Sequence, residues 1–179
     1  MITKGKSFEY ETALALNRCF KEEKINAIAY RKFNFRFTKQ GFDILVDSCG
    51  IKYYLALECK SITLPGKNGV YFSCCSADKN GKSQIESENE FLKFSGRAGI
   101  MAVEVKNKDN KFKAAYLLPW SVVWNCYISS NACVSLDDIK AGVEVNWIKG
   151  GYKIKSEDLR TINSLIPLGR SRSRRVEEN

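Results

Sequence analysis

The sequence predicts a mixed α/β fold with a central β-sheet flanked by helices. Apolar residues recur at helical spacing from Lys6 to Glu23, strand-like alternation follows, and a capped helix from Ser83 separates two groups of strands. The chain has 179 residues with 44% hydrophobic and 12% aromatic content, which suffices for one domain with a substantial core. We therefore expect one domain over 1–166 and a basic, disordered tail over 167–179.

The first helix carries one acidic residue in an unusual place. Phe8, Ala13 and Leu16 belong to its apolar stripe. Glu9 lies four residues before Ala13 and seven before Leu16, so it falls on the same stripe, where a simple solvated glutamate would not be placed. A strand follows, and its alternation favours a core position for Phe33, Phe35 and Phe37 over stacking on unpaired bases.

Two strands joined by the turn "SCG" are expected around 42–48 and 52–60. Alternation places Glu58 and Lys60 on one face of the second strand. On the first strand it places Asp43 on the side opposite Phe42, Ile44 and Val46, and hairpin pairing would bring Asp43 opposite Glu58. Two carboxylates and a lysine then meet at the strand ends.

The rest of the chain alternates between turn-rich and periodic segments. Residues 63–82 are rich in Gly, Ser and Lys and predict a mobile loop around a short strand. Ser83 and Glu86 form a capping box, and Gly96 suits the end of that helix. The further expected elements are strands near 100–106 and 112–118, a short helix opened by Pro119, a hairpin turning at Lys149-Gly150-Gly151, and a last helix capped by Ser156 and ended by Pro167.

Composition limits the possible chemistry. Histidine is absent, which excludes Ser-His-Asp and Cys-His catalysis and His-ligated zinc. The seven cysteines include no CxxC pair, so neither a disulfide framework nor a zinc ribbon is indicated, and we expect them to act as small apolar residues. Any catalysis must therefore use carboxylates, lysine, hydroxyls or thiols.

The charge favours a polyanionic partner. Lys and Arg number 29 against 20 Asp and Glu, which gives a formal charge of +9. No apolar run is long enough for a membrane span or a secretory signal, so we expect the protein in the cytoplasm, or wherever its nucleic acid lies.

The acidic residues suggest a cation site. Like charges held together are costly unless a cation joins them, and Mg²⁺ prefers a few carboxylate oxygens while it keeps several waters. The pattern Asp43-x₁₄-Glu58-x-Lys60 suits phosphodiester hydrolysis, in which the cation polarises the phosphate and Lys60 orients the water or offsets charge. The alternative is a salt pair between Glu58 and Lys60 on an exposed strand, with Asp43 merely starting its strand.

The motifs "KGKSFEYE", "GFDILV", "LALECKS" and "FLKFSGRAGIMAVEVK" together resemble the archaeal Holliday-junction resolvases (Hjc type) of the PD-(D/E)XK nuclease superfamily. The resemblance covers a catalytic core of about 4–118, and 119–166 form an extension to it. The "GKSFE" start and Gln84 also resemble RecU-type resolvases. The phenylalanine before Asp43 departs from the proline of the superfamily name, which binds no metal.

The resemblance implies a restriction-endonuclease-like fold, a mixed central β-sheet flanked by helices. It implies catalytic roles for Glu9, Asp43, Glu58, Lys60 and Gln84. The implied cofactor is Mg²⁺, with Mn²⁺ as a substitute, held by Asp43, Glu58 and the backbone carbonyl of Cys59, with Glu9 acting through water. It also implies a homodimer.

Basic side chains near this site are expected to contact DNA phosphates, although a solvated surface would explain each one equally well. They are Lys4, Lys6, Arg31, Lys32, Arg36, Lys39, Lys67 and Lys82. Tyr71 and Phe72 are candidates for contacting the open centre of a junction, and the alternative is that they belong to the core of a short strand. The arginines of the tail either follow the DNA backbone or stay solvated.

The sequence thus predicts a Mg²⁺-dependent endonuclease that resolves four-way DNA junctions by paired cuts. The alternatives are another nuclease of the same superfamily, such as a restriction or repair endonuclease, and a DNA-binding protein without activity. The complete set of Asp43, Glu58 and Lys60 argues against the last of these.

Overall fold

The structure is a computed structural model of the chain. The residues that it describes are 6–31, 41–49, 53–75, 81–109, 112–149 and 151–165. The predicted strand around Phe33 and the predicted tail over 167–179 lie outside them. In the described part of the chain, no helix has both the length and the apolar character that crossing a membrane requires.

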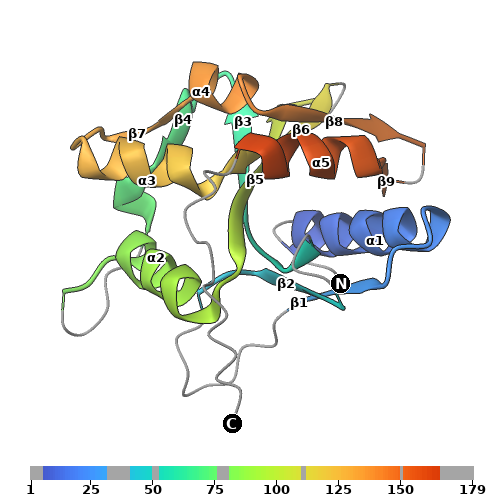
Figure 1. Ribbon diagram of the computed structural model, residues 1–179. Coiled ribbons are helices and arrows are strands. Elements are labelled where there is room, and N and C mark those ends of the chain that lie inside the picture. Colours follow the sequence, from blue (N-terminus) through green and yellow to red (C-terminus); the bar gives the residue numbers. More distant parts are fainter. Residues whose placement is uncertain are drawn as a thin grey trace, which may run out of the picture.

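A seven-stranded mixed sheet crosses the molecule in the order β1-β2-β3-β5-β6-β8-β9 (Figure 1). Only β3 and β5 pair in parallel, and the other neighbours are antiparallel. A small second sheet joins β4 to β7. The strands are β1 (Ala27–Arg31), β2 (Ile44–Ser48), β3 (Leu55–Leu64), β4 (Gly69–Tyr71), β5 (Ala98–Asn107), β6 (Lys113–Pro119), β7 (Cys133–Ser135), β8 (Val143–Ile148) and β9 (Gly151–Tyr152).

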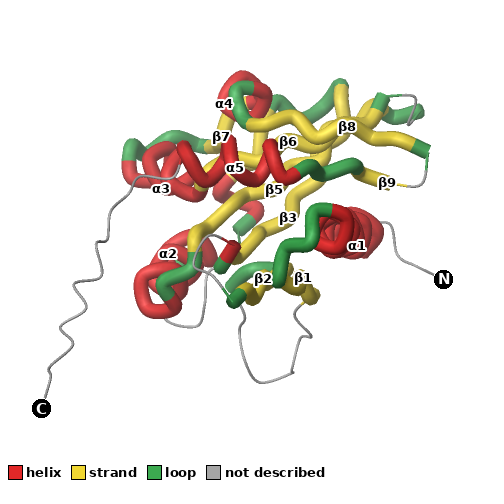
Figure 2. The backbone as a smooth tube through the Cα atoms, turned by 45° about the vertical axis from the view of Figure 1, so that its right-hand side comes forward, coloured by secondary structure: helices red, strands yellow, loops and turns green. Residues whose placement is uncertain are grey.

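Helices cover both faces of the large sheet, which confirms the predicted fold class (Figures 1 and 2). One buried cluster joins the sheet to α1 (Lys6–Glu22) and α5 (Ser156–Leu165). A second cluster, on the opposite face, joins it to α2 (Gln84–Ser95), α3 (Trp120–Ile128) and α4 (Leu136–Lys140). A 3₁₀ turn, η2 (Phe72–Cys74), follows β4. We call these clusters the α1 face and the α2 face.

Local signals in the sequence set the ends of α2 as expected. The Ser83 hydroxyl accepts from the Glu86 N–H, and the Glu86 carboxylate accepts from the Ser83 N–H at 2.9 Å. Gly96 ends the helix in the left-handed conformation at φ 68°, where a residue without Cβ is least strained. The start of α2 is therefore fixed, and with it the position of Gln84, its first residue.

The β2–β3 hairpin forms, and β3 alternates as predicted, with Leu55 and Leu57 in the α1 face and Ala56 in the α2 face. The prediction that Phe42 shares a side with Ile44 and Val46 is wrong. Phe42 lies in the α2 face, with its ring 5.0 Å from that of Trp120. The reason is that β2 begins only at Ile44, so strand alternation does not govern the residues before it.

The short strand predicted within 63–82 is present as β4. It pairs with β7, a strand too short to be recognised in the sequence, and β3 continues to Leu64, beyond its predicted end at residue 60. Ser156 does not act as the predicted cap: α5 begins at Ser156 itself, the Asp158 carboxylate accepts from the Lys155 N–H, and the Ser156 hydroxyl accepts from Arg160.

The C-terminal third shares the core of the preceding part. Strand β8 pairs with β6, and the predicted hairpin forms with Trp147 opposite Tyr152 and Ile148 opposite Gly151. The rings of Tyr152 and Phe8 meet edge to face at 5.4 Å, which ties β9 to the first helix.

A buried carboxylate ties these parts together. Glu104 on β5 is only 1% exposed, and its oxygens accept from Ser61 at 2.8 Å and Tyr152 at 2.9 Å. Lys106 and Lys113 lie 2.6 and 3.1 Å from it. Burial alone would raise the pKa of Glu104, but the hydrogen bonds and the two ammonium groups lower it below its usual value. Glu104 is thus an ionised and fully compensated group.

The Glu104→Ala variant should lose about 3–5 kcal/mol of the free energy of unfolding, because it removes the ion-pair partner of Lys106 and the acceptor of the buried Tyr152 hydroxyl, while Lys113 keeps its ion pair with Glu11. Urea unfolding followed by circular dichroism measures this. Glu90→Ala, which breaks an exposed pair with Lys82, is the control and should cost less than about 1 kcal/mol. Equal losses in the two variants would contradict the role given to Glu104.

Candidate functional site

The pairing of β2 with β3 brings Asp43 beside Glu58. Ile44 lies opposite Leu57 at the last pair of this ladder, and Asp43 comes immediately before it. The Asp43 carboxylate accepts a hydrogen bond of 2.8 Å from the N–H of Cys59. Asp43 therefore caps the point where the two strands part, at the position that the hairpin argument predicted.

Glu58 and Lys60 occupy the same face of β3. Glu58 is 3% exposed, and its Oε1 lies 2.7 Å from the ammonium nitrogen of Lys60. Burial by itself lowers the pKa of Lys60, but the adjacent Glu58 carboxylate raises it, and the net shift is upward. Lys60 thus remains a cation, and the pair is not the exposed salt bridge of the alternative interpretation.

The first turns of α2 complete this group. The Gln84 amide donates to Glu58 Oε1 at 2.9 Å and to Glu88 Oε1 at 2.7 Å, so one side chain bridges two carboxyls. Glu88 is fully buried, and its other oxygen, Oε2, has no hydrogen-bond partner. We refer to Asp43, Glu58, Lys60, Gln84 and Glu88 as the carboxylate corner.

Sequence reasoning missed Glu88, although a signal was present. Glu88 lies three residues after Ile85 and four before Leu92, and both of these apolar residues belong to the α2 face. This is the same helical spacing that singled out Glu9. The inward position of Glu88 could thus have been predicted, but its contact with Gln84 and Glu58 depends on how α2 docks on β3.

The carboxyl groups of the corner are poorly compensated. Burial, and after it the neighbouring Glu58, raise the pKa of Asp43 to about 7 against the effect of the hydrogen bond from the Cys59 N–H. Burial and then Glu88 raise the pKa of Glu58 to about 7. Burial likewise raises the pKa of Glu88 to about 7. Three acids with raised pKa values therefore share one ammonium and one amide as neighbours.

Glu9 lies at the margin of the corner. Its carboxylate is 2.7 Å from Nη2 of Arg31, and its side chain is 26% exposed, so it is half-buried rather than part of the core. The charge of Glu9 still contributes to the raised pKa of Asp43. Arg31, which is predicted to contact DNA, forms this ion pair with Glu9, and its buried Nε has no hydrogen-bond partner.

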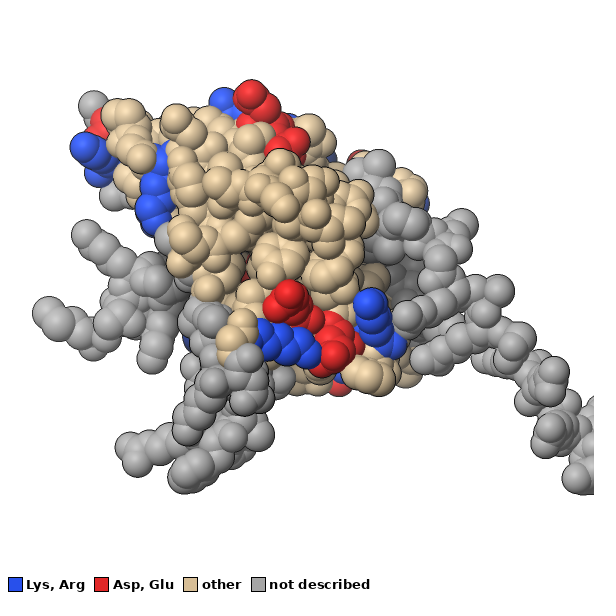
Figure 3. Space-filling view, turned by 90° about the vertical axis from the view of Figure 1, so that its left-hand side faces the viewer, with Lys and Arg blue, Asp and Glu red and all other residues tan. Residues whose placement is uncertain are grey.

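Of the other basic residues predicted to contact DNA, the structure describes the side chains of two, Lys67 and Lys82. Lys67 is exposed in the turn between β3 and β4, and Lys82, just before α2, forms an ion pair with Glu90. On the face over α2 and α3, side chains of both charges gather below a broad uncharged area (Figure 3). Lys4, Lys32, Arg36 and Lys39 lie outside the described residues, as does the side chain of Lys6.

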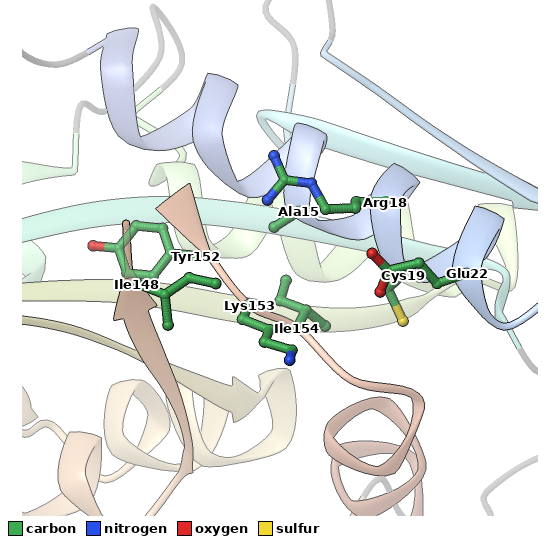
Figure 4. A pocket seen from close by; sticks show the side chains of 8 residues that line it. All are labelled: Ala15, Arg18, Cys19, Glu22, Ile148, Tyr152, Lys153 and Ile154. Atoms are coloured by element: carbon green, nitrogen blue, oxygen red, sulfur yellow. The ribbon is translucent and has the colours of Figure 1, made fainter. Parts of the chain in front are cut away.

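The surface of the described residues includes two hollows of similar size. One, of about 170 Å³, adjoins the carboxylate corner through Lys60. The other, of about 160 Å³, lies on the α1 face between α1 and β9 (Figure 4). Its rim carries Arg18, Glu22 and Lys153, which are exposed charges of both signs, and none of its residues belongs to the corner. The first hollow is therefore the one relevant to the site.

The corner offers ligands of the kind that a divalent cation takes. Among the described residues, no three Cys, Asp or Glu side chains stand close enough around one point to hold a metal ion as they are placed. Mg²⁺, however, needs only one or two carboxylates, since it keeps several waters. Asp43 and Glu58 supply these, and the unpartnered Oε2 of Glu88 is a further hard oxygen beside them. The residues present thus fit such an ion.

No protein-family model and no curated protein matches the chain. Among solved structures, it is similar to Hjc of Archaeoglobus fulgidus, a Holliday junction resolvase from an archaeal hyperthermophile. Their identity is 13%, the TM-score is 0.42, and the match covers 87% of this chain and 91% of that one. A likeness of this size leaves the activity of the chain open.

Without metal, the corner should make stability depend on pH. The pKa values of Asp43, Glu58 and Glu88 are raised to about 7 from about 4, so the folded state binds more protons than the unfolded state between these values. The free energy of unfolding in EDTA should therefore fall as the pH rises from about 5 to 8. Urea unfolding across this range measures the slope.

A matched pair of variants assigns the slope to the corner. Glu88→Gln removes one of the three raised acids and should make the slope smaller, whereas Glu90→Gln, on the exposed side of the same helix, should leave it unchanged. A wild-type slope that is flat, or that rises with pH, would contradict the upward shifts.

Proposed function

We propose that the chain is a divalent-cation-dependent endonuclease that resolves four-way DNA junctions by paired phosphodiester cuts. The observation that carries this proposal is the convergence of Asp43, Glu58 and Lys60 in one desolvated corner, with Glu88 and Gln84 packed against them. Strongly perturbed acids gathered with a cationic side chain are more typical of a functional site than of a structural one.

Asp43 and Glu58 are proposed to hold Mg²⁺, or Mn²⁺ in its place, with the Cys59 carbonyl as a further ligand and Glu9 acting through water. When bound, such a cation polarises the phosphate and lowers the pKa of a coordinated water. Gln84 fixes the orientation of the Glu58 carboxylate through its hydrogen bond of 2.9 Å. The N–H of Cys59 does the same for Asp43.

Lys60 is proposed to act on the phosphate itself. Its ammonium lies 2.7 Å from Glu58, its side chain is 27% exposed, and its raised pKa keeps it charged at neutral pH. A partly exposed cation at the edge of the corner can donate hydrogen bonds to a non-bridging phosphate oxygen or to the attacking water, and it offsets the charge that develops in the transition state. Lys60 is therefore assigned to the transition state rather than to proton abstraction.

The wider surroundings favour a polyanionic substrate. The chain carries a formal charge of +9, and exposed Lys67 lines the hollow next to the corner together with Lys60. The first turn of α2 also presents its N-terminus at the corner, where the helix dipole favours negative charge. Contacts with phosphates give affinity that falls with salt and reads little sequence.

The symmetry of the substrate favours a homodimer. Resolving a four-way junction requires two symmetry-related cuts, and each chain supplies one carboxylate corner. A closed two-fold dimer would present two such corners in a fixed relation. We therefore propose a homodimer, because the two cuts in the substrate are related by symmetry.

Cleavage of a synthetic four-way junction beside a matched linear duplex tests the proposal. With Mg²⁺, the wild type should make paired nicks in the junction and should leave the duplex uncut. With EDTA, it should cut neither DNA. Asp43→Asn and Glu58→Ala should lower the rate by at least about 100-fold, because they remove metal ligands. Both variants should still bind the junction, because these residues do not contact phosphates.

Other outcomes separate the alternatives. Cutting of the duplex at a comparable rate would indicate another kind of nuclease, and binding without any cutting would indicate a DNA-binding protein without activity. The control is Glu144→Gln, at an exposed residue of β8 outside the corner, which should cut at the wild-type rate. Normal cleavage by Glu58→Ala would refute the assignment of the corner.

A further inference from the structure

The hollow next to the carboxylate corner has walls of mixed chemistry. Lys60 and Ile62 of β3 form one wall, and Lys67, Val70 and Tyr71, in or before β4, form the other. Its volume is about 170 Å³. Pockets that enclose a whole small molecule are usually about 300–1,000 Å³, so this hollow suits one part of a larger ligand.

The hollow continues directly from the corner. Side chains alternate along a strand, so Glu58, Lys60 and Ile62 project from the same face of β3, about 7 Å apart from one to the next. Lys60 belongs to both places: its ammonium contacts Glu58, and its side chain lines the hollow. A group that enters the hollow therefore lies directly beside the proposed point of cleavage.

Tyr71 gives the hollow an available aromatic surface. Its side chain is 37% exposed, and in the described part of the chain its ring is not among those that pack against another ring. The adjacent Phe72 differs, because its ring packs edge to face against Tyr127 at 5.5 Å and belongs to the α2 face. The two candidates from the sequence thus separate: Phe72 is partly buried and packs against the core, and Tyr71 is open to a ligand.

The remaining walls suit a flat ring joined to an anion. Ile62 and Val70 are buried, at 2% and 6% exposure, and provide an apolar floor. Lys60 and Lys67 provide the positive charges, and no acidic side chain lines the hollow. The hollow beside α1 differs in this respect, because Glu22 on its rim would repel an anion.

We propose that this hollow binds one unpaired nucleotide next to the cleaved bond, with its base against Tyr71 and its phosphate toward Lys60 and Lys67. Aromatic stacking with adjacent cations is the common way to hold an unpaired base. This inference rests on the proposed function and places in the hollow a base that leaves its stack at the branch point, beside the scissile phosphate. A base within a continuous duplex remains stacked and does not reach Tyr71.

The test uses binding in EDTA, so that it does not depend on cleavage. The probes are a duplex with one bulged 2-aminopurine and the same duplex with that base paired. The wild type should bind the bulged probe more tightly and quench its fluorescence. Tyr71→Phe should behave like the wild type, whereas Tyr71→Ala should lose about 5- to 100-fold in affinity for the bulged probe only. Phe94→Ala, at an aromatic residue that is 85% exposed on α2, is the control and should change neither affinity.

The outcomes distinguish this inference from the proposed nuclease activity. Equal binding of the two probes by the wild type, or an unchanged preference in Tyr71→Ala, would overturn the nucleotide subsite even if the wild type cuts junctions. A preference that Tyr71→Ala loses would support the subsite, and it would do so even if the wild type cut no DNA with Mg²⁺. Circular dichroism and thermal unfolding of Tyr71→Ala exclude a folding defect as the cause.

Discussion

The arrangement at the centre of this protein depends on three acids, Asp43, Glu58 and Glu88, held in a desolvated space between β2, β3 and α2. Burial and mutual repulsion raise all three pKa values to about 7. Packing alone gives no reason for such an arrangement, since apolar residues would fill the space at lower cost. Proteins keep poorly compensated buried acids mainly where function requires them. A divalent cation is the partner that would relieve the repulsion between these acids.

The same chain shows what a structural buried carboxylate is like. Glu104 is as deeply buried as Glu58, yet its pKa is lowered, because two ammonium groups and two hydroxyls surround it. Glu58 and Glu88 share a single amide, and Lys60 is the ammonium that lies against Glu58. The two environments lie on the two faces of one sheet. The degree of compensation, rather than the burial, therefore distinguishes the acids of the site from those that stabilise the fold.

Part of this could be predicted from local sequence, because strand alternation and helix capping act over a few residues. Alternation placed Glu58 and Lys60 together, and the capping box fixed Gln84 at the start of α2. Phe42 was misplaced because it precedes its strand. The pairing of β4 with β7 joins segments about sixty residues apart in the sequence, and neither strand is long enough to signal it. The partners of Glu9 and Glu88 depend on how two helices dock on the sheet, which no local pattern specifies.

We propose that Asp43 and Glu58 hold a divalent cation together. Anomalous diffraction from crystals of the protein soaked in Mn²⁺ tests it most directly. We expect a peak within about 2.2 Å of carboxylate oxygens of both residues, with Glu88 nearby. A peak elsewhere in the molecule would contradict this proposal. So would the absence of a peak at saturating Mn²⁺ in crystals in which the corner is intact, as shown by the contact between Lys60 and Glu58.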